Sequence, residues 1–423
     1  MATSDKSTLP GSSDDRRGHD PRGSGNAPSA RSSGDEPEPP LAAASLAGVP
    51  MPVAADGRLA FEPIEPRSAP IDTEGTLPWI KRNLFGTVPS SIATVLFIAL
   101  ALWWLPQLVR WALVDAVFAP NSDRCQAARD LGACWGVVSE KYRLIIFGRY
   151  PYDDQWRPLL ATLLMVALLV ASCVRLFWKP WLAALWLVVL AVFFMLMFGG
   201  VLSMEYVSTD RWGGLPLTML LATLSIALAF PLAVAVALGR RSNMPAIRTV
   251  CVLYVELVRG VPLISVLFMA SFLFPLFMPP GTNIDVLLRV LVGITLFSGA
   301  YMAEIVRGGL QAIPKGQIEA ADTLGLSYWQ SQRKVVLPQA LALVVPGIMN
   351  NFISIFKDTS LVTIVSLYEL TGSMQLALNS DANWRPFKIE AYLFIAAIYF
   401  LFCFSMSRYS LWIEKRLSTS KNR

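Results

Sequence analysis

Several apolar runs of the chain are longer than 18 residues and carry few charges. An α-helix rises about 1.5 Å per residue, so about 20 apolar residues cross the roughly 30 Å hydrocarbon core of a bilayer. No water is present there to satisfy backbone amides, which leaves the helix as the structure that such a run can form. The runs therefore predict an all-α polytopic membrane protein. The charged fraction of 16% agrees with this class, because soluble domains contain about 25%.

The runs predict eight transmembrane helices in a chain of four regions. Residues 1–85 are rich in Ser, Gly, Pro and charged residues and are expected to form a disordered cytoplasmic tail. Residues 86–204 hold three spans and a polar loop at 113–157, residues 205–415 hold the other five, and 416–423 form a basic tail. The expected spans are 90–112, 158–177, 181–204, 214–239, 249–278, 286–306, 335–356 and 390–412.

The fifth span is expected to be broken. Glu256 and Arg259 interrupt its apolar run, and Pro262, which lacks an amide donor, follows them. A charge at the bilayer centre costs about 2.5–3.5 kcal/mol, so the first part of this run is expected at the cytoplasmic interface. The spacing of three residues predicts that Glu256 and Arg259 pair on one helical face. Glu304 and Arg307 repeat that spacing where the sixth span ends.

Basic residues predict the orientation of the chain. They cluster between spans four and five, between spans six and seven, and after span eight, all on one side of an eight-span topology. Lys and Arg concentrate in cytoplasmic loops, so this side and both termini are expected to be cytoplasmic. The loop at 113–157 is then periplasmic, and its own basic residues are interspersed with acidic ones. The clustered residues are Arg240, Arg241, Arg248, Arg307, Lys315, Arg333, Lys334, Lys415 and Arg416.

Histidine and cysteine are too scarce for most metal and catalytic chemistry. His19 is the single histidine, and the five cysteines show no C-x-x-C spacing. The sequence therefore predicts no multi-histidine metal site, no histidine-based catalytic triad and no cofactor bound by this chain. Cys125 and Cys134 share the loop at 113–157 and could form a disulfide if that loop is periplasmic; two free thiols are an equal alternative.

The polar stretch between spans six and seven, 307–334, opens a rare frame. Glu-Ala-Ala is followed by glycine four residues after its second alanine, and by Leu-Pro twelve residues after that glycine. Ala and Glu favour helix, glycine at a helix end allows a sharp turn, and proline is tolerated in a first helical turn. The frame predicts a short helix, a glycine corner and a second helix; an ordinary cytoplasmic loop is the alternative. Its residues are Glu319, Ala320, Ala321, Gly325, Leu337 and Pro338.

This frame resembles the EAA coupling loop of ATP-binding-cassette (ABC) importer permeases, which docks on the ATPase. Over about 212–415 the chain resembles the polar amino-acid (histidine/glutamine) branch of that family, which implies the five-helix core of a type I importer. The additional N-terminal spans look most like the M subunit of the general L-amino-acid permease of Gram-negative bacteria. The other segments that carry the resemblance are Trp212–Thr218, Tyr254–Leu263, Gly299–Gly309 and Lys357–Leu361.

The resemblance implies an L-amino-acid importer subunit of the bacterial inner membrane that works by alternating access and is not itself an enzyme. The sequence contains no G-x-x-x-x-G-K-[ST] motif, so ATP and Mg are expected to be used by separate subunits. The implied partners are a second homologous permease chain in a heterodimer, two ATP-binding subunits and a periplasmic amino-acid-binding protein. An ion-coupled secondary transporter is the alternative, but no repeat relates 90–204 to 214–412.

Polar residues at the end of span seven are a candidate translocation path. They interrupt apolar sequence, and the following run, 361–370, is too short for a span. Non-helical backbone at membrane depth is stable only when it is buried in protein or lines a cavity. The alternative is structural, with Lys357 and Asp358 pairing to stabilise a bend. The candidates are Asn350, Asn351, Lys357, Asp358, Thr359 and Ser360.

Overall fold

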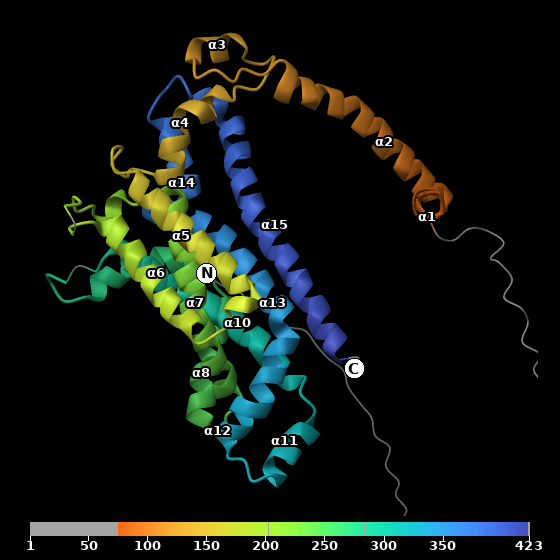
Figure 1. Cartoon of the computed structure of the whole chain (residues 1–423), viewed down its shortest axis with the longest axis vertical. Helices are drawn as coiled ribbons and strands as arrows, with labels where there is room; N and C mark the ends of the chain where they lie inside the picture. Colours follow the sequence, from red (N-terminus) through yellow and green to blue (C-terminus); the bar gives the residue numbers. More distant parts are fainter. Residues whose placement is uncertain (1–74, 202, 283, 422–423) are drawn as a thin grey trace, which may run out of the picture. The chain divides into compact units, whose positions relative to one another are not determined.

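The computed structural model describes residues 75–201, 203–282 and 284–421 in two units, Met1–Gly86 and Thr87–Arg423 (Figure 1). In the first unit α1 spans Thr76–Leu84. The disordered tail predicted for 1–85 is therefore wrong over this helix, whose last turn carries basic residues that favour the helix dipole. The rest of that prediction and His19 lie outside the described residues.

In the second unit, seven helices within the described ranges are long and apolar enough to cross a membrane, and one bent pair brings the number to eight. This confirms the predicted all-α polytopic fold, although α6 ends before residue 204 and α10 continues past residue 306. The seven are α2 (Val88–Val109, continued to Val114), α5 (Trp156–Cys173), α6 (Trp181–Phe198), α7 (Gly214–Arg240), α10 (Val286–Gln311), α13 (Leu337–Asp358, preceded by a helical stretch from Tyr328) and α15 (Lys388–Lys421).

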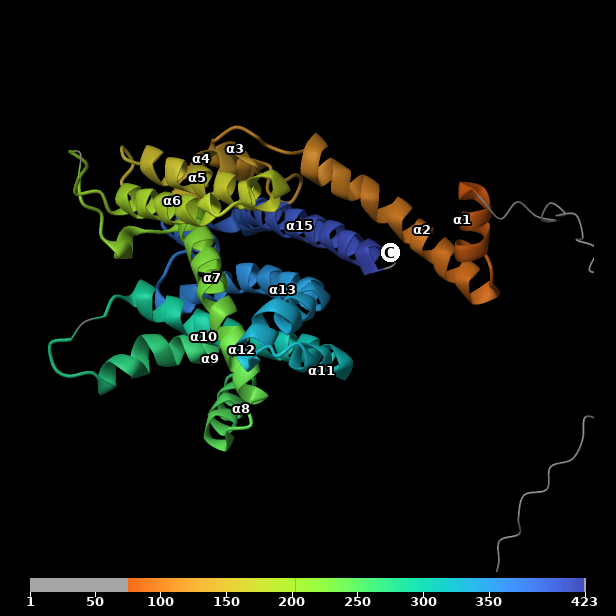
Figure 2. The ribbon, with the colours of Figure 1, turned by 60° about the horizontal axis from the view of Figure 1, so that its bottom comes forward.

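The fifth span is broken where proline predicts it. Helix α8 (Pro245–Arg259) and the following segment, which starts with α9 (Leu263–Phe268), are inclined at 105°. Pro262 is the N-cap of α9 and takes an extended conformation, which ends the continuous helix. Because of this break, α8 leaves the direction of the span and its exposed side stays uncovered by the rest of the chain (Figure 2).

Helix α7 lies at the centre of the permease core and packs along α10 (Figure 1). Ala229, Ala233 and Ala237 are fully buried at intervals of four residues, in one cluster with Ala303 and Val306 of α10. Between membrane helices the attraction comes from close packing, and small side chains let two backbones approach. The alanine stripe therefore explains why these two helices form the tightest contact of the bundle.

The helices α5 and α6 lie side by side and join the same core as α7 (Figures 1 and 2). The fully buried Arg157 of α5 donates from Nε to the carbonyl oxygen of Leu196 at 2.8 Å and from Nη1 to that of Glu205 at 3.1 Å. A cation at the carboxyl end of α6 satisfies free carbonyls and favours the helix dipole. In contrast, no residue of α2 is buried in the part of the chain that the structure describes.

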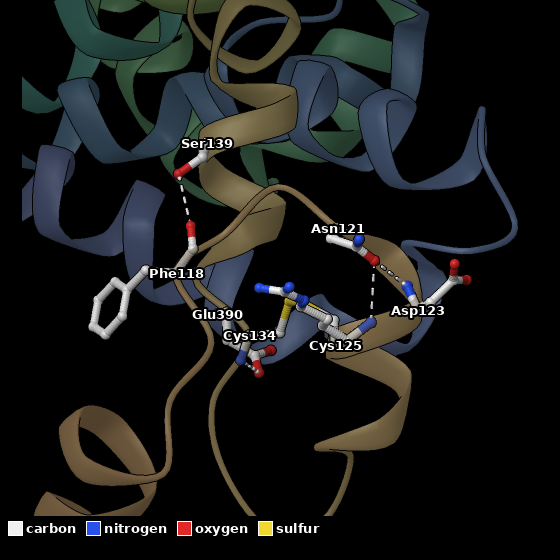
Figure 3. Close-up of a disulfide and its surroundings, with 8 residues drawn as sticks. Phe118, Asn121, Asp123, Cys125, Cys134, Ser139 and Glu390 are labelled. Carbon is white, nitrogen blue, oxygen red and sulfur yellow. Dashed lines mark hydrogen bonds between the residues drawn. A yellow bond between two sulfur atoms is a disulfide. The ribbon is translucent and has the colours of Figure 1, made fainter.

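The loop at 113–157 is folded and docked on the core. It contains α3 (Ser122–Ala127) and α4 (Gly136–Phe147), and α4 packs against α14 (Leu370–Asn379) and α7. Of the two alternatives for its cysteines the structure has the disulfide, Cys125–Cys134, with the Cα atoms 5.4 Å apart (Figure 3). The amide of Cys134 donates to Glu390 Oε1 of α15 at 2.9 Å, so the disulfide loop is tied to the core.

Candidate functional site

The candidate coupling loop has the helix–glycine–helix geometry that its frame predicts. Helix α11 (Lys315–Thr323) is followed by a turn at Gly325, which has φ +69°, and then by α12 (Tyr328–Ser331). The amide of Gly325 donates to the Asp322 carbonyl at 2.9 Å, and that of Leu326 donates to the Ala321 carbonyl at 3.2 Å. This pair of bonds is a Schellman motif, in which the residue with positive φ is usually glycine. The corner therefore depends on local bonds.

The frame residues divide between the surface and the core. Glu319, Ala320 and Gly325 are exposed, whereas Ala321 is buried. Leu337 packs in the core cluster of α7 and α10, and Pro338 lies in the first turn of α13. The loop is tied to α13 by Gln339 Nε2, which donates to Gln317 Oε1 at 3.2 Å. The exposed residues of the frame thus form a surface, and the residues at its end fix the loop to α13 and to the core.

Two exposed apolar residues extend this surface, and the frame did not point to them. Leu324 is 79% exposed and Trp329 is 69% exposed, on either side of the glycine corner. Apolar and aromatic side chains left uncovered at one place on a structure mark an interaction surface. The signal in the sequence was the aromatic pair at 328–329 inside an otherwise polar stretch.

An ion-pair network joins the helices next to this loop. Arg240 of α7 contacts Glu304 Oε2 of α10 at 2.8 Å and Glu256 Oε1 of α8 at 3.0 Å. Arg307 donates from Nε to Glu304 Oε2 at 2.9 Å, so the predicted Glu304–Arg307 contact is present in the structure. The network holds together the ends of three helices, one of which leads directly into α11.

The predicted Glu256–Arg259 pair is wrong. Glu256 pairs with Arg240, and Arg259 lies over the ring of Tyr301, with Cζ 5.4 Å from the ring centroid. The reason is tertiary: α7 and α8 pack together, which brings Arg240 to Glu256, while the end of α8 places Arg259 beside α10. Helical spacing within α8 contained no signal for either contact.

The candidate path residues separate onto two sides of α13. Asn350 and Lys357 are exposed together with Ser354, and intervals of four and three residues place them on one helical face. Asn351 faces α10, where its Oδ1 accepts from Ser298 Oγ at 3.1 Å. Thr359 is buried and donates to the Phe356 carbonyl at 2.8 Å.

The remaining candidates surround a turn of 3-10 helix that begins where α13 ends. Asp358 and Ser360 are half-buried there. Lys357 and Asp358 form no ion pair, although both belong to the described residues, so the pairing expected in the structural alternative is absent. The bend arises instead from the change of helix type at Thr359.

Glu369 is a buried carboxylate that lies just beyond this turn and was not among the candidates. It is fully buried and is the N-cap of α14, accepting at Oε1 from the amides of Thr371 at 2.9 Å and Gly372 at 3.0 Å. Tyr399 Oη of α15 donates to Oε2 at 2.8 Å. Burial raises the pKa of the Glu369 carboxyl above its ordinary range. The sequence signal was an acidic residue at the end of the short apolar run.

The structure offers no metal site in the residues it describes, because no group of His, Cys, Asp and Glu comes together there. The site consists of a glycine corner with exposed apolar neighbours, an ion-pair network behind it, and a polar face on α13.

Comparisons with known proteins give consistent matches. Residues 229–419 match the family described as "Binding-protein-dependent transport system inner membrane component". The chain is similar to the inner membrane amino-acid ABC transporter permease protein YhdY of Escherichia coli, with 45% identity over 362 residues that cover 84% of this chain and 97% of YhdY. This alignment is longer than the region 205–415, so the similarity extends into the N-terminal spans.

Two further matches concern a second relative and a solved structure. The glutamate/glutamine/aspartate/asparagine transport system permease protein BztC of Rhodobacter capsulatus is 36% identical over 421 residues, covering 84% of this chain and 97% of BztC. A solved structure described as "Crystal structure of an amino acid ABC transporter with histidines" is 32% identical and covers 48% of this chain and 92% of its own, with a TM-score of 0.43.

Proposed function

This chain belongs to the amino-acid permeases of binding-protein-dependent ABC transporters. We propose that it is coupled to ATP hydrolysis by partner subunits through the exposed side of α11 and the glycine corner. The chain is a multi-span permease subunit of an amino-acid importer of the inner membrane, and importers of this family work with ATPase subunits and a binding protein. Three features of the chain are assigned a role: the α11 surface meets the ATPase, the polar face of α13 lines the substrate path, and both termini lie in the cytoplasm.

The ATPase-docking surface is the exposed side of α11 with the glycine corner. The observation that carries this assignment is the uncovered set of Glu319, Gly325 and Trp329 on two short helices and the turn between them, which extend beyond the ends of α10 and α13 (Figure 1). ATP and Mg are used by the two ATPase subunits, and this chain hydrolyses no ATP of its own. Its role is to transmit the movement of the ATPase subunits from α11 to the membrane helices.

Movement of α11 reaches the membrane helices through short, stiff connections. Three residues separate α11 from α10, and Gln339 ties the loop to α13. The network centred on Arg240 and Glu304 makes α7, α8 and α10 move as one group at this end. Closure of the ATPase dimer then rocks the helices between inward-open and outward-open arrangements.

The polar face of α13 lines the translocation path against a second, homologous permease chain, with which this chain forms a heterodimer. Asn350, Ser354 and Lys357 are exposed in this chain within a span. A charged side chain facing hydrocarbon is costly, and such residues instead face a bundle interior or a water-filled cavity. A partner permease provides that interior, which supports an assembly of two such chains.

Joint substitution of Lys357→Leu and Asp358→Leu tests the path. We expect uptake of labelled amino acids to fall more than about tenfold, a loss of at least about 1.4 kcal/mol, because the path loses its charges. Membrane abundance, measured by immunoblot, should stay normal because the two side chains form no ion pair with each other. Lys388→Leu, which removes an exposed lysine at the start of α15, is the control. Unchanged uptake in the double variant would refute the assignment.

We further propose that the loop at 113–157 is periplasmic and that both termini are cytoplasmic. The disulfide Cys125–Cys134 supports this orientation, because structural disulfides persist in oxidising compartments. The excess of arginine and lysine at the opposite end, beside α11, supports it independently.

Thiol labelling in intact cells checks the orientation. In a variant whose other three cysteines, Cys173, Cys251 and Cys403, are replaced by alanine, a cysteine introduced at exposed Asp153 of the same loop should react with a membrane-impermeant maleimide. The matched control keeps Cys251 alone and should react only after lysis, since it lies on α8 at the α11 end. Labelling of Asp153→Cys only after lysis would reverse the proposed topology.

A further inference from the structure

A basic cavity lies beside the turn between α7 and α8, at the end of the bundle that carries α11. Its volume is about 300 Å³, which is at the lower limit of small-molecule sites, about 300–1,000 Å³. Three helices contribute to it: the end of α7, the start of α8 and the end of α10. Its polar lining includes Arg240, Arg241, Asn243, Arg248, Arg307 and Gln311.

The cavity has more positive charge than its neighbours neutralise. Four arginines line it, while the carboxylates in contact with them are two, Glu256 and Glu304, which leaves a net charge of two positive units. Arg241 donates to the carbonyl of Leu310 at 2.7 Å, a contact that removes no charge. The exposed Arg248 has no ion pair or hydrogen bond from its side chain within the described chain.

Backbone groups add to the attraction for an anion. Helix α8 is 15 residues long, and its N-cap residue, Met244, provides no side-chain hydrogen bond. The amides of the first turn of α8 therefore lack a protein cap beside Asn243 and Arg248. A helix start of this kind favours negative charge, and here it coincides with a cavity already lined by arginines.

The other side of α8 is apolar and uncovered. Ile247 is 43% exposed, Val250 67%, Leu253 57% and Leu257 58%. This stripe begins at Ile247, one residue before the cavity-lining Arg248, and runs along a helix set at 105° to the segment that follows. A molecule with a charged head and apolar chains matches both features, with its head in the cavity and its chains on the stripe.

We propose that this cavity binds the phosphate headgroup of an anionic phospholipid, whose acyl chains lie along α8. Basic pockets between membrane helices are sites of this kind, because guanidinium groups bind phosphate oxygens through paired hydrogen bonds. The lipid joins α7, α8 and α10 at the end of the bundle that carries α11, so it stabilises the packing of these three helices there. The proposal rests on the membrane location of the chain and not on the ATPase assignment.

Lipid retention by the purified importer complex tests the site. Native mass spectrometry should show phosphatidylglycerol retained in preference to phosphatidylethanolamine, and Arg248→Gln should lower that retention about fivefold, the effect of one basic residue at a membrane surface. Arg248 has no protein partner to lose, so the variant should fold normally. Arg333→Gln, which removes another exposed arginine of this end outside the cavity, should retain lipid like the wild type.

Three results would overturn the proposal. The first is equal retention of the two lipids by the wild type. The second is unchanged phosphatidylglycerol retention in Arg248→Gln. If that variant retains the lipid but loses a protein subunit, the cavity is a protein contact and not a lipid site. The third is displacement of the lipid by millimolar inorganic phosphate, which would make the natural ligand a soluble phosphate. A complex that lacks ATPase subunits would refute the coupling assignment and leave this measurement readable.

Discussion

A Gly325→Asp variant should remain in the membrane but lose ATP-driven uptake and its ATPase subunits. Gly325 has φ +69°, a conformation that costs other residues about 1–2 kcal/mol, or about tenfold in the population of the correct corner. No atom of this chain lies within 4 Å of an added Cβ, so the aspartate does not disturb the fold around it. The expected loss of uptake and of ATPase binding therefore comes from a change in the shape and the exposed surface of the proposed docking loop. Uptake of labelled amino acid and co-purification of the ATPase measure it.

Gly281→Asp is the matched control for that experiment. Gly281 also has positive φ, +88°, and nothing within 4 Å of an added Cβ, but it lies between the broken fifth span and α10, away from α11. The same backbone strain is therefore introduced outside the proposed surface, and uptake should stay near that of the wild type. Stoichiometric ATPase together with persistent transport in Gly325→Asp would show that the corner is not the coupling element.

Glu369→Ala should destabilise the folded chain more than the loss of an exposed carboxylate does. It removes the N-cap of α14, worth about 1 kcal/mol, and takes the carboxylate acceptor away from the half-buried Tyr399 hydroxyl, which costs about 0.5–1.5 kcal/mol more. The expected loss of about 2 kcal/mol should appear as a fall of several degrees in the melting temperature of the purified chain. Glu256→Ala, at an exposed carboxylate, is the comparison. Equal melting temperatures for the two variants would refute the stabilising role of Glu369.

The pH dependence of stability supplies a second readout of Glu369. Its pKa is raised by burial, so the folded chain binds this proton more tightly than the unfolded chain does. The stability linked to that proton is fully present below the ordinary carboxyl pKa, about 4.3, and is lost as the pH rises through the folded value. Glu369→Gln cannot titrate, so the melting temperature of the wild type relative to this variant should fall as the pH rises. A difference that is constant with pH would contradict the assignment.

Local features of this protein were predictable because their physical causes are local. Each apolar run has to satisfy its own amides in hydrocarbon, so the eight spans follow from runs of about 20 residues. Pro262 breaks the fifth span through its own missing amide donor. The glycine corner closes through bonds between residues no more than five positions apart, Ala321 to Leu326, so its frame was readable without a structure. Where the prediction used helical spacing alone, it found Glu304–Arg307 and failed for Glu256–Arg259.

The contacts between distant segments were decided only by the tertiary structure. Arg240 reaches Glu304 across 64 positions, and Cys134 reaches Glu390 across 256, because helix packing sets which side chains meet. The same holds for the basic cavity and for the burial of Glu369, since both require the ends of several helices to come together. The sequence alone determined which runs form helices long and apolar enough to cross a membrane and where the loop between α10 and α13 turns, since hydrocarbon and backbone geometry act on each segment separately. Packing then selected which charges meet, such as Arg240 with Glu256 and Glu304, because a charge that is partly withdrawn from water is stabilised by a partner.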